Sequence, residues 1–318
     1  MLLYSLAPPS AVGQPPTPTI VAYVIQALQH GDLAEASGAV AQYRRLHGDT
    51  PEALEALSWV ARGDLALGQK TEALATAKEI ERIAQTSLGM RTVDSEPHLP
   101  VALGAAYEIE VQALVANNQR AQALQMLRSL QRKWQGTSLA ERMQKNINLL
   151  VLQGRPMPPL RETDWIGAKP KDPGAWRGKP LLIFFWAHWC ADCKADAPIV
   201  AKLAGEFEPK GLQVIAPTRL YGYTAQDEHA PAHEEREFID KVFEHYYAAI
   251  PQASVPLDSG NFERFGASTT PTIVLVNRAG IVQTYHPGAM DEASLRLAIE
   301  AVLASKPTAP SRERQRPG

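Results

Sequence analysis

The stretch LLIFFWAHWCADCK occupies residues 181–194 and contains the only two cysteines of this 318-residue chain, Cys190 and Cys193. Its first six residues are a continuous apolar run, and the turn-forming sequence RGKP precedes them. A run of this length, bounded by turn residues, is typical of a strand that is buried on both faces of a sheet. We therefore expect a buried strand, followed by a turn that carries both cysteines and leads into a helix.

The spacing of the cysteines predicts a redox-active pair. If Cys190 starts the helix, its sulfur faces unpaired backbone N–H groups at the positive end of the helix dipole, which favours thiolate over thiol. Cys193 falls on the same face of the first turn, so the two sulfurs can close a disulfide with acceptable geometry. Cys190 is then the attacking sulfur and Cys193 the resolving one. The negative charge of Asp192 disfavours the thiolate and so partly cancels the effect of the helix end. The direction of electron flow therefore stays open.

Other cysteine chemistries fit the sequence poorly. A structural zinc site needs four ligands, and His188 is the only histidine near the pair, because His229 and His233 flank a proline that disrupts a helical arrangement. Covalent haem requires a histidine directly after the second cysteine, where Lys194 stands. A peroxiredoxin expects Ser or Thr at the position of Ala187. We therefore expect no metal and no cofactor besides the redox-active disulfide itself.

Several separate features together resemble the thioredoxin-fold thiol–disulfide oxidoreductases of the TlpA/ResA type. They are the motif FWAHWCADCKADAP at residues 185–198, the apolar segment GLQVIAPT at 211–218, the dipeptide Thr270-Pro271 before an apolar run at 272–276, and Gly288 ahead of a helical pattern at 291–303. The similarity covers roughly residues 155–304. It implies a thioredoxin-like α/β domain with a central mixed sheet flanked by helices. It also implies electron exchange with protein disulfides or dithiols.

The resemblance further implies roles for residues around the cysteines. The dipeptide Thr270-Pro271 corresponds to the cis-proline of the family, and the backbone of Thr270 would lie beside the sulfurs and pair with an extended substrate chain. Trp189, Thr270 and Pro271 are therefore the candidate substrate-docking and supporting residues. A segment that such proteins insert before the cis-proline strand corresponds to residues 219–254, with a helix expected at 234–247.

The proton relay is the least defined part of the predicted site. Cytosolic thioredoxins carry a buried acid six residues before the first cysteine, where this chain has Phe184. The resemblance implies an acid from the inserted segment instead, and Glu234 and Glu235 at the start of its helix are the candidates. A solvated position on the helix surface is the alternative for each. The partners implied are protein substrates and an unidentified protein that donates or accepts electrons.

Residues 20–152 have a helical composition, rich in Ala, Leu, Gln and Glu with few β-branched runs. Helical segments pair around small polar turns, each followed by an alanine that permits close helix approach. The turns are Gly31-Asp32, Gly68-Gln69 and Asn118-Gln119, and the alanines are Ala36, Ala73 and Ala123. This pattern resembles a tetratricopeptide-like array, which is generally a platform for a protein partner. A helical bundle without a binding role is the alternative.

Composition divides the chain into four parts. Residues 1–19 resemble the end of a secretory signal whose basic and longer apolar start is missing, and a flexible arm is the alternative. Residues 20–152 form the predicted helical domain. Residues 153–304 form the redox domain, which begins with a stretch dense in Pro and Gly. Residues 305–318 form a predicted disordered tail. We expect an exported, periplasmic protein, while a cytoplasmic location stays open.

The overall composition excludes other classes of protein. Charged residues make up 21% of the chain and the net charge is −2 at pH 7, which gives no electrostatic surface for nucleic acid. The chain has no window of eighteen uninterrupted apolar residues, so we expect no transmembrane segment in it. Three functions stay open: an exported thiol–disulfide oxidoreductase, for which we expect the direction of a reductase, a helical binding protein with a secondary redox pair, and a regulator whose disulfide is a redox sensor.

Overall fold

The computed structural model describes residues 19–305, apart from residues 90, 168, 169, 171 and 173. The predicted N-terminal arm, except for Thr19, and the predicted C-terminal tail, except for Ser305, lie outside the described residues. By its internal contacts the chain divides into two compact units, Met1–Ala113 and Leu114–Gly318. The division falls in the last turn of the fifth helix rather than in a loop.

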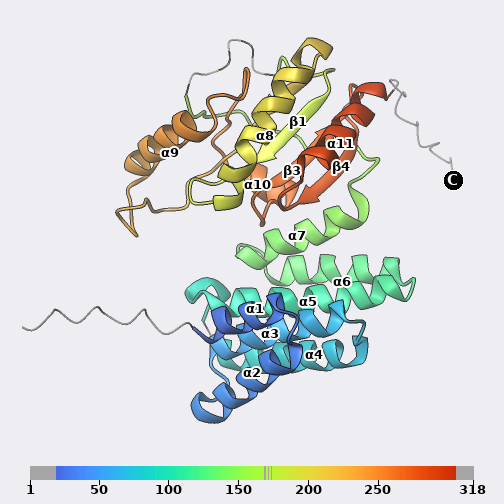
Figure 1. The fold of residues 1–318 in the computed structure, drawn as a ribbon, viewed down its shortest axis with the longest axis vertical. Helices are drawn as coiled ribbons and strands as arrows, with labels where there is room; N and C mark the ends of the chain where they lie inside the picture. The colour runs from blue at the N-terminus through green and yellow to red at the C-terminus, as the bar shows by residue number, and fades with distance from the viewer. Residues whose placement is uncertain (1–18, 90, 168–169, 171, 173, 306–318) are drawn as a thin grey trace, which may run out of the picture. The chain divides into compact units, whose positions relative to one another are not determined.

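The first unit consists of helical hairpins, as its composition predicts (Figure 1). Its elements are α1 (Ile20–Gln29), α2 (Leu33–His47), α3 (Pro51–Ala66), α4 (Lys70–Leu88), the short 3₁₀ helix η1 (Val93–Ser95) and most of α5 (His98–Ala116). The side chains of Thr19, Asp32 and Thr50 accept hydrogen bonds from the first turns of α1, α2 and α3. These caps satisfy backbone N–H groups that a helix start leaves unpaired. Ala36 and Ala73 are fully buried, in agreement with their predicted role.

Helix α5 is the one long apolar helix among the described residues. By length and composition alone it is long enough to cross a membrane, and more than half of its apolar window is buried inside the protein. Burial of this extent is that of a core helix, and it includes Leu99, Leu103 and Tyr107, which are fully buried. The apolar character of α5 is therefore accounted for by packing within the protein.

The second unit begins with a helical hairpin that packs against the α/β region. Its helices are α6 (Arg120–Lys133) and α7 (Ser138–Val151), and α7 contacts α10 (Ser259–Phe265). The side-chain amide of Asn148 on α7 donates a hydrogen bond to the carbonyl oxygen of Phe265 at 2.8 Å. The hydroxyl of Tyr285, on the last strand, donates to the same oxygen at 2.8 Å. The carbonyl at the end of α10 thus joins the hairpin to the sheet.

A four-stranded mixed sheet lies at the centre of the second unit. Its strands are β1 (Leu181–Phe185), β2 (Gln213–Ile215), β3 (Thr272–Val276) and β4 (Val282–Pro287), in the order β2-β1-β3-β4. Strand β1 runs parallel to β2 and antiparallel to β3, and β3 is antiparallel to β4. All residues of β1 are buried, as the apolar run predicts. The predicted fold class is confirmed: a helical region precedes a thioredoxin-like α/β domain.

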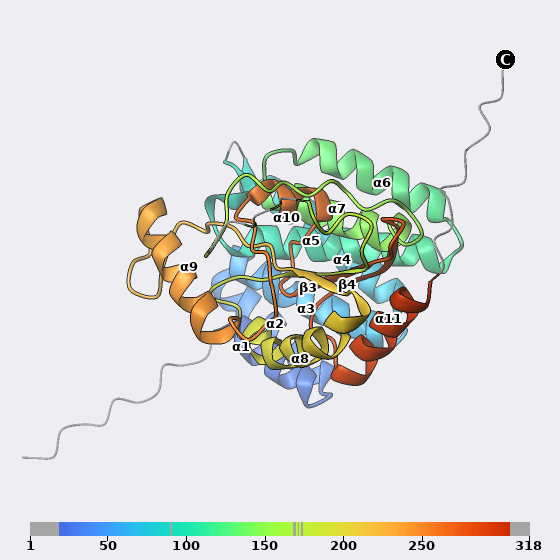
Figure 2. The ribbon, with the colours of Figure 1, turned by 90° about the horizontal axis from the view of Figure 1, so that it is seen from above.

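Helices cover both faces of the sheet, and Figure 2 shows α8 and α11 on the opposite side of the strands from α10. The helices not yet introduced are α8 (Ala191–Phe207), the short 3₁₀ helix η2 (Glu208–Lys210), α9 (Ala232–Tyr246), which is the predicted insert helix, and α11 (Glu292–Ala304). Leu182 and Phe184 pack in the core with α8, α9 and α11, whereas Ile183 and Phe185 pack against α10. Strand β1 therefore leads from the middle of the core directly to the cysteines.

Gly266 is the residue that permits close contact between α10 and α7. It caps α10 with a φ of 59°, and a Cβ at this position would lie 2.3 Å from the backbone nitrogen of Lys145 on α7. We predict that Gly266→Ala lowers the free energy of unfolding by about 2–4 kcal/mol, because it adds a backbone clash to the strain of a left-handed conformation. Urea denaturation followed by circular dichroism measures the loss.

Gly280 provides the matched control for this substitution. It also has a positive φ, of 76°, but open space surrounds it. We expect Gly280→Ala to cost only about 1–2 kcal/mol, which is the strain alone. Equal losses for the two variants would contradict a tight contact between α10 and α7.

Candidate active site

The two cysteines lie where the chain passes from β1 into α8. Cys190 is the N-cap residue of α8, with an extended backbone (φ −73°, ψ 108°), and the backbone N–H of Cys193 donates to its sulfur at 3.0 Å. The two sulfurs form a disulfide of 2.07 Å, and their Cα atoms are 5.3 Å apart. Both cysteines are buried, whereas Trp189 is 48% exposed. The expected disulfide and helix-start position are present, and the separate roles of the two sulfurs stay a prediction.

Hydrogen bonds to the segment after β2 hold the turn before the cysteines. The backbone N–H of Trp186 donates to the carbonyl oxygen of Pro217 at 3.2 Å, and its indole N–H donates to that of Ala216 at 2.9 Å. The hydroxyl of Thr218 in turn donates a hydrogen bond to the carbonyl oxygen of Trp186 at 3.0 Å. Trp186 is fully buried. The turn is therefore fixed by the core on which it rests.

The Thr270–Pro271 peptide bond is cis, as expected, and directly precedes β3. Because Phe185 at the end of β1 pairs with Thr272 at the start of β3, the sheet places this dipeptide at the same end as the cysteines. The hydroxyl of Thr270 is buried and has no hydrogen-bond partner among the described residues. The sequence-predicted residues Cys190, Cys193, Thr270 and Pro271 thus come to one end of the sheet.

A buried pair joins the inserted segment to the active-site turn. His188 and Glu235 are 2% and 0% exposed, and Nε2 of His188 lies 3.1 Å from Oε1 of Glu235. The same carboxylate accepts hydrogen bonds from the backbone N–H groups of Tyr221 and Gly222. Burial lowers the pKa of His188, and the carboxylate of Glu235 acts in the opposite direction. This contact, between residues 47 positions apart, is invisible to local sequence patterns.

Aromatic side chains surround the imidazole of His188. The rings of Tyr221, Tyr223 and Phe238 lie edge-on to it, with centroids 5.2–5.5 Å away. All three belong to the inserted segment. The ring of Tyr221 also meets that of the exposed Trp189 edge-on, at 5.5 Å. The insert therefore forms one wall of the site beside the cysteines.

The two predicted relay acids have different surroundings. Glu234 is half exposed and lies 3.9 Å from His233, which is the solvated position considered above. Glu235 is buried, and its hydrogen bonds run to His188 and the backbone of the insert. His229 and His233 have no metal partner, since the described residues contain no group of three or more His, Cys, Asp or Glu side chains placed to hold a metal ion.

Asp196 is a further acid at the site that the sequence analysis missed. It lies on α8, one helical turn after Cys193, and is 8% exposed, with an Oδ2 atom that has no hydrogen-bond partner. Burial raises the pKa of Asp196 and the charge of Asp192 raises it further, while a hydrogen bond from the Met290 backbone opposes the shift. The three-residue spacing from Cys193 places both side chains on one helix face, and this signal was available in the sequence.

Comparison with known proteins finds similarity over part of the second unit. Residues 152–301 match the Redoxin family. The chain is 25% identical over 127 residues to the thiol-disulfide oxidoreductase ResA of Halalkalibacterium halodurans, an alignment that covers 39% of this chain and 63% of the relative. It is 26% identical over 140 residues to the thiol:disulfide interchange protein DsbE of Pseudomonas fluorescens biotype C, covering 44% and 68%. The resemblance of this region to thioredoxin-like thiol–disulfide oxidoreductases is therefore confirmed. The chain spans about three fifths of the length of the curated relatives that it matches.

Solved structures resemble part of this chain. A thiol-disulfide isomerase from Corynebacterium glutamicum is 18% identical, with a TM-score of 0.40, and the alignment covers 48% of this chain and 97% of that protein. A secreted disulfide oxidoreductase of Mycobacterium tuberculosis is 19% identical, with a TM-score of 0.34, and the alignment covers 43% and 92%.

The raised pKa of Asp196 predicts a pH-dependent stability. A carboxyl group whose folded pKa is raised costs stability once it ionises, so the cost sets in as the pH rises above the ordinary carboxyl pKa of about 3.9 and is complete above the raised value. We predict that Asp196→Asn, which removes this cost, makes the oxidised protein more stable than wild type at pH 7. The difference should fade as the pH falls toward about 4. Urea midpoints measured from pH 4 to pH 8 give the result.

Asp291 provides a control of opposite sign. Hydrogen bonds from Ser294 lower the pKa of this exposed N-cap residue of α11. Its ionised form therefore stabilises the fold, and that stability is lost as the pH falls through the lowered pKa. Asp291→Asn should be less stable than wild type at pH 7. If Asp196→Asn also proved less stable than wild type at pH 7, ionisation of Asp196 would not destabilise the fold, and the prediction would be wrong.

Proposed function

We propose that this protein is a thiol–disulfide oxidoreductase that reduces disulfides of client proteins outside the cytoplasm. One observation carries the proposal: the sulfur of Cys190 occupies the N-cap position of α8 and accepts a hydrogen bond from the backbone N–H of Cys193. A sulfur in this position is stabilised as a thiolate, which is the reactive form in disulfide exchange. The names of the Redoxin-like relatives agree with such chemistry.

The reaction proceeds in two exchange steps. The thiolate of Cys190 attacks one sulfur of the client disulfide, whose S–S bond breaks as a mixed disulfide forms and a client thiolate leaves. The thiolate of Cys193 then attacks the sulfur of Cys190, which releases the second client thiolate and closes the Cys190–Cys193 disulfide. The client gains two electrons and two protons, and the cysteine pair loses them. A second protein, a dithiol donor, must return the pair to the reduced form.

The surrounding residues have distinct parts in this proposal. Trp189 is the exposed aromatic surface beside Cys190, and the backbone of Thr270 next to Pro271 pairs with the extended client chain. Thr270 has a buried hydroxyl without a partner, which a client group can satisfy. No cofactor takes part, because the disulfide itself carries the electrons. These assignments rest on the position of each residue at the end of the sheet.

Export is the proposed location. The apolar residues near the N-terminus, followed by small residues, are the supporting sequence feature. The alternative function is a protein-binding helical module whose thioredoxin-like domain is a redox sensor rather than a catalyst. The two differ in turnover, because a sensor changes its own disulfide once, whereas a reductase acts on many clients.

The activity is tested by reduction of insulin in the presence of dithiothreitol. Wild-type protein at catalytic concentration should accelerate the reaction over many turnovers, and Cys190→Ser should return it to the uncatalysed rate. Cys193→Ser should accumulate a mixed disulfide with insulin, since the resolving sulfur is missing. In that variant, absorbance near 240 nm should show Cys190 ionising well below about 8.5, the ordinary cysteine pKa. A single stoichiometric exchange without turnover would favour the sensor.

Asp196 is the proposed proton acceptor for Cys193, and Glu235 holds His188 in place. Glu234 and Glu235 stay the alternatives predicted from the sequence. We expect Asp196→Asn to slow the second exchange step at pH 7 by at least about tenfold, because Cys193 must lose its proton before it attacks. Glu235→Gln and Glu234→Gln should leave that step closer to wild type. Single-turnover reduction of a fluorescent disulfide peptide measures the step, and a larger effect of Glu235→Gln would assign the relay to Glu235.

A further inference from the structure

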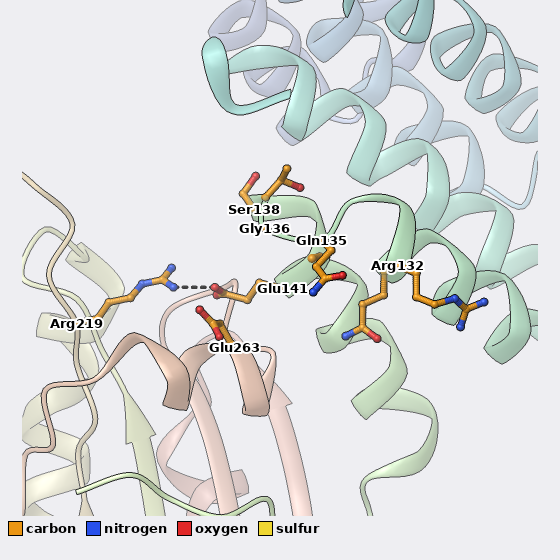
Figure 3. Close-up of a pocket in the computed structure, with 10 residues that line it drawn as sticks. Arg132, Gln135, Gly136, Ser138, Glu141, Arg219 and Glu263 are labelled. Carbon is orange, nitrogen blue, oxygen red and sulfur yellow. Dashed lines mark hydrogen bonds and ion pairs between the residues drawn. The ribbon is translucent and has the colours of Figure 1, made fainter. Parts of the chain in front are cut away.

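A cavity of about 760 Å³ with four charged side chains in its lining lies between the α6–α7 hairpin and the α/β region of the second unit (Figure 3). The turn between α6 and α7 and the first turn of α7 form one wall, with Glu141 projecting from the latter. Arg219, from the segment after β2, and Glu263, on α10, form the opposite wall. The cavity contains none of the residues that carry out disulfide exchange in the proposed function.

Glu141 has an unsatisfied oxygen in this cavity. Its side chain is 10% exposed, and Oε2 accepts a hydrogen bond from Arg219 at 2.7 Å. The other oxygen, Oε1, is buried and has no hydrogen-bond partner among the described residues. Burial raises the pKa of Glu141, Arg219 opposes this shift, and the charge of Glu263 adds to it. A ligand that donates a hydrogen bond would complete the environment of this carboxylate.

The charges at this end of the cavity favour a cation. Figure 3 shows Arg219, Glu141 and Glu263 close together, with Arg132 on the far side of the cavity. At this end of the cavity Glu141 is paired with Arg219 and Glu263 adds a second carboxylate, so this end has a net negative charge. Arg132 balances the charge of the lining as a whole, but it lies on the far side. A partly buried site of this kind attracts a positively charged group that also donates hydrogen bonds. The side chains of lysine and arginine meet both requirements.

The cavity lies within reach of the cysteines. The guanidinium carbon of Arg219 is 5.1 Å from the ring centroid of Tyr221, and that ring is 5.5 Å from the ring of Trp189. The guanidinium carbon of Arg219 is thus at most about 11 Å from the ring centroid of Trp189, the residue directly before Cys190. An extended chain advances about 3.3 Å per residue, so a side chain roughly three to six residues from a reacting cysteine reaches the cavity.

We propose that the cavity binds a lysine or arginine side chain of the client polypeptide, close in sequence to the cysteine that exchanges at Cys190. This inference rests on the proposed function and defines its substrate class: clients with a basic residue near the reacting disulfide. Glu141 and Glu263 receive the basic group, and Arg219 holds Glu141 toward the cavity. The α6–α7 hairpin is then part of the substrate site.

Direct binding tests the inference without relying on activity. Fluorescence anisotropy of labelled ten-residue peptides, with Ser in place of the reacting Cys, is measured against the oxidised full-length protein at low ionic strength. The peptides differ only in carrying Lys, Gln or Glu four residues from the Ser. We expect the Lys peptide to bind about three- to tenfold more tightly than the Gln peptide, and the Glu peptide to bind most weakly. Equal binding of the three peptides would overturn the inference.

Variants identify the residues responsible. Glu263→Gln, at an exposed position, should remove most of the preference for Lys over Gln, and Glu141→Gln should do the same. Glu300→Gln, which removes one exposed negative charge on α11, is the matched control and should leave the preference unchanged. Loss of the preference in all three variants would mean that net charge, not the cavity, attracts the peptide.

Kinetics separate this inference from the proposed function. With the corresponding cysteine peptides as glutathione mixed disulfides, the Lys preference should appear in kcat/KM, and Glu263→Gln should remove it. The rate with glutathione disulfide, which is too small to reach the cavity while it reacts, should be the same for Glu263→Gln and wild type. If the protein exchanged disulfides with all substrates but showed no preference for Lys, the role of the cavity would be rejected and the proposed function would stand. If the protein bound the Lys peptide selectively but catalysed no disulfide exchange, the proposed function would be rejected and the binding role of the cavity would stand.

Discussion

The hydrogen bond from the backbone N–H of Cys193 to the sulfur of Cys190 is the interaction around which the second unit is arranged. It exists because β1, buried on both faces, ends directly before α8 and leaves Cys190 at the N-cap position. A sulfur at the positive end of a helix gains stability when it is charged. The remainder of the α/β region fixes the position and direction of this helix start.

Contacts from distant segments complete the site. The sheet register brings Thr270-Pro271 to the same end as the cysteines, and Glu235 ties the inserted segment to His188 in the turn before them. This insert also supplies Arg219, which joins α7 through Glu141. A continuous set of side-chain contacts therefore runs from Trp189 through Tyr221 and Arg219 to Glu141 on the α6–α7 hairpin, and it links the active-site turn to the cavity at this hairpin.

Local patterns in the sequence were sufficient for the elements that carry the cysteines. The apolar run before them predicted β1 and the spacing predicted the disulfide, whereas the cis bond at Thr270-Pro271 was implied by the family resemblance. The insert helix, expected at residues 234–247, is α9 (Ala232–Tyr246). Helix composition predicted the hairpins, since intrinsic propensity and apolar spacing act over a few residues.

The features that escaped prediction depend on packing between distant residues. The burial of Glu235 against His188 results from the way the insert folds over the active-site turn. The helices α6 and α7 have a helical composition like that of the first unit, yet α7 packs on α10 through Asn148 and beside Gly266. Asp196 is a different case, because its spacing from Cys193 was visible although its burial was not. Tertiary contacts decide which of several acids is buried away from water, and the local pattern of a single sequence does not show these contacts.

The reduction potential of the Cys190–Cys193 pair tests most directly whether the helix start makes this disulfide reactive. It is measured by equilibrating the full chain in dithiothreitol or glutathione redox buffers and counting alkylated thiols by mass spectrometry. We predict one reversible two-electron transition between about −270 and −120 mV, the range of catalytic thioredoxin-fold pairs. A potential below about −300 mV, which is typical of structural disulfides, would contradict a catalytic role for the pair.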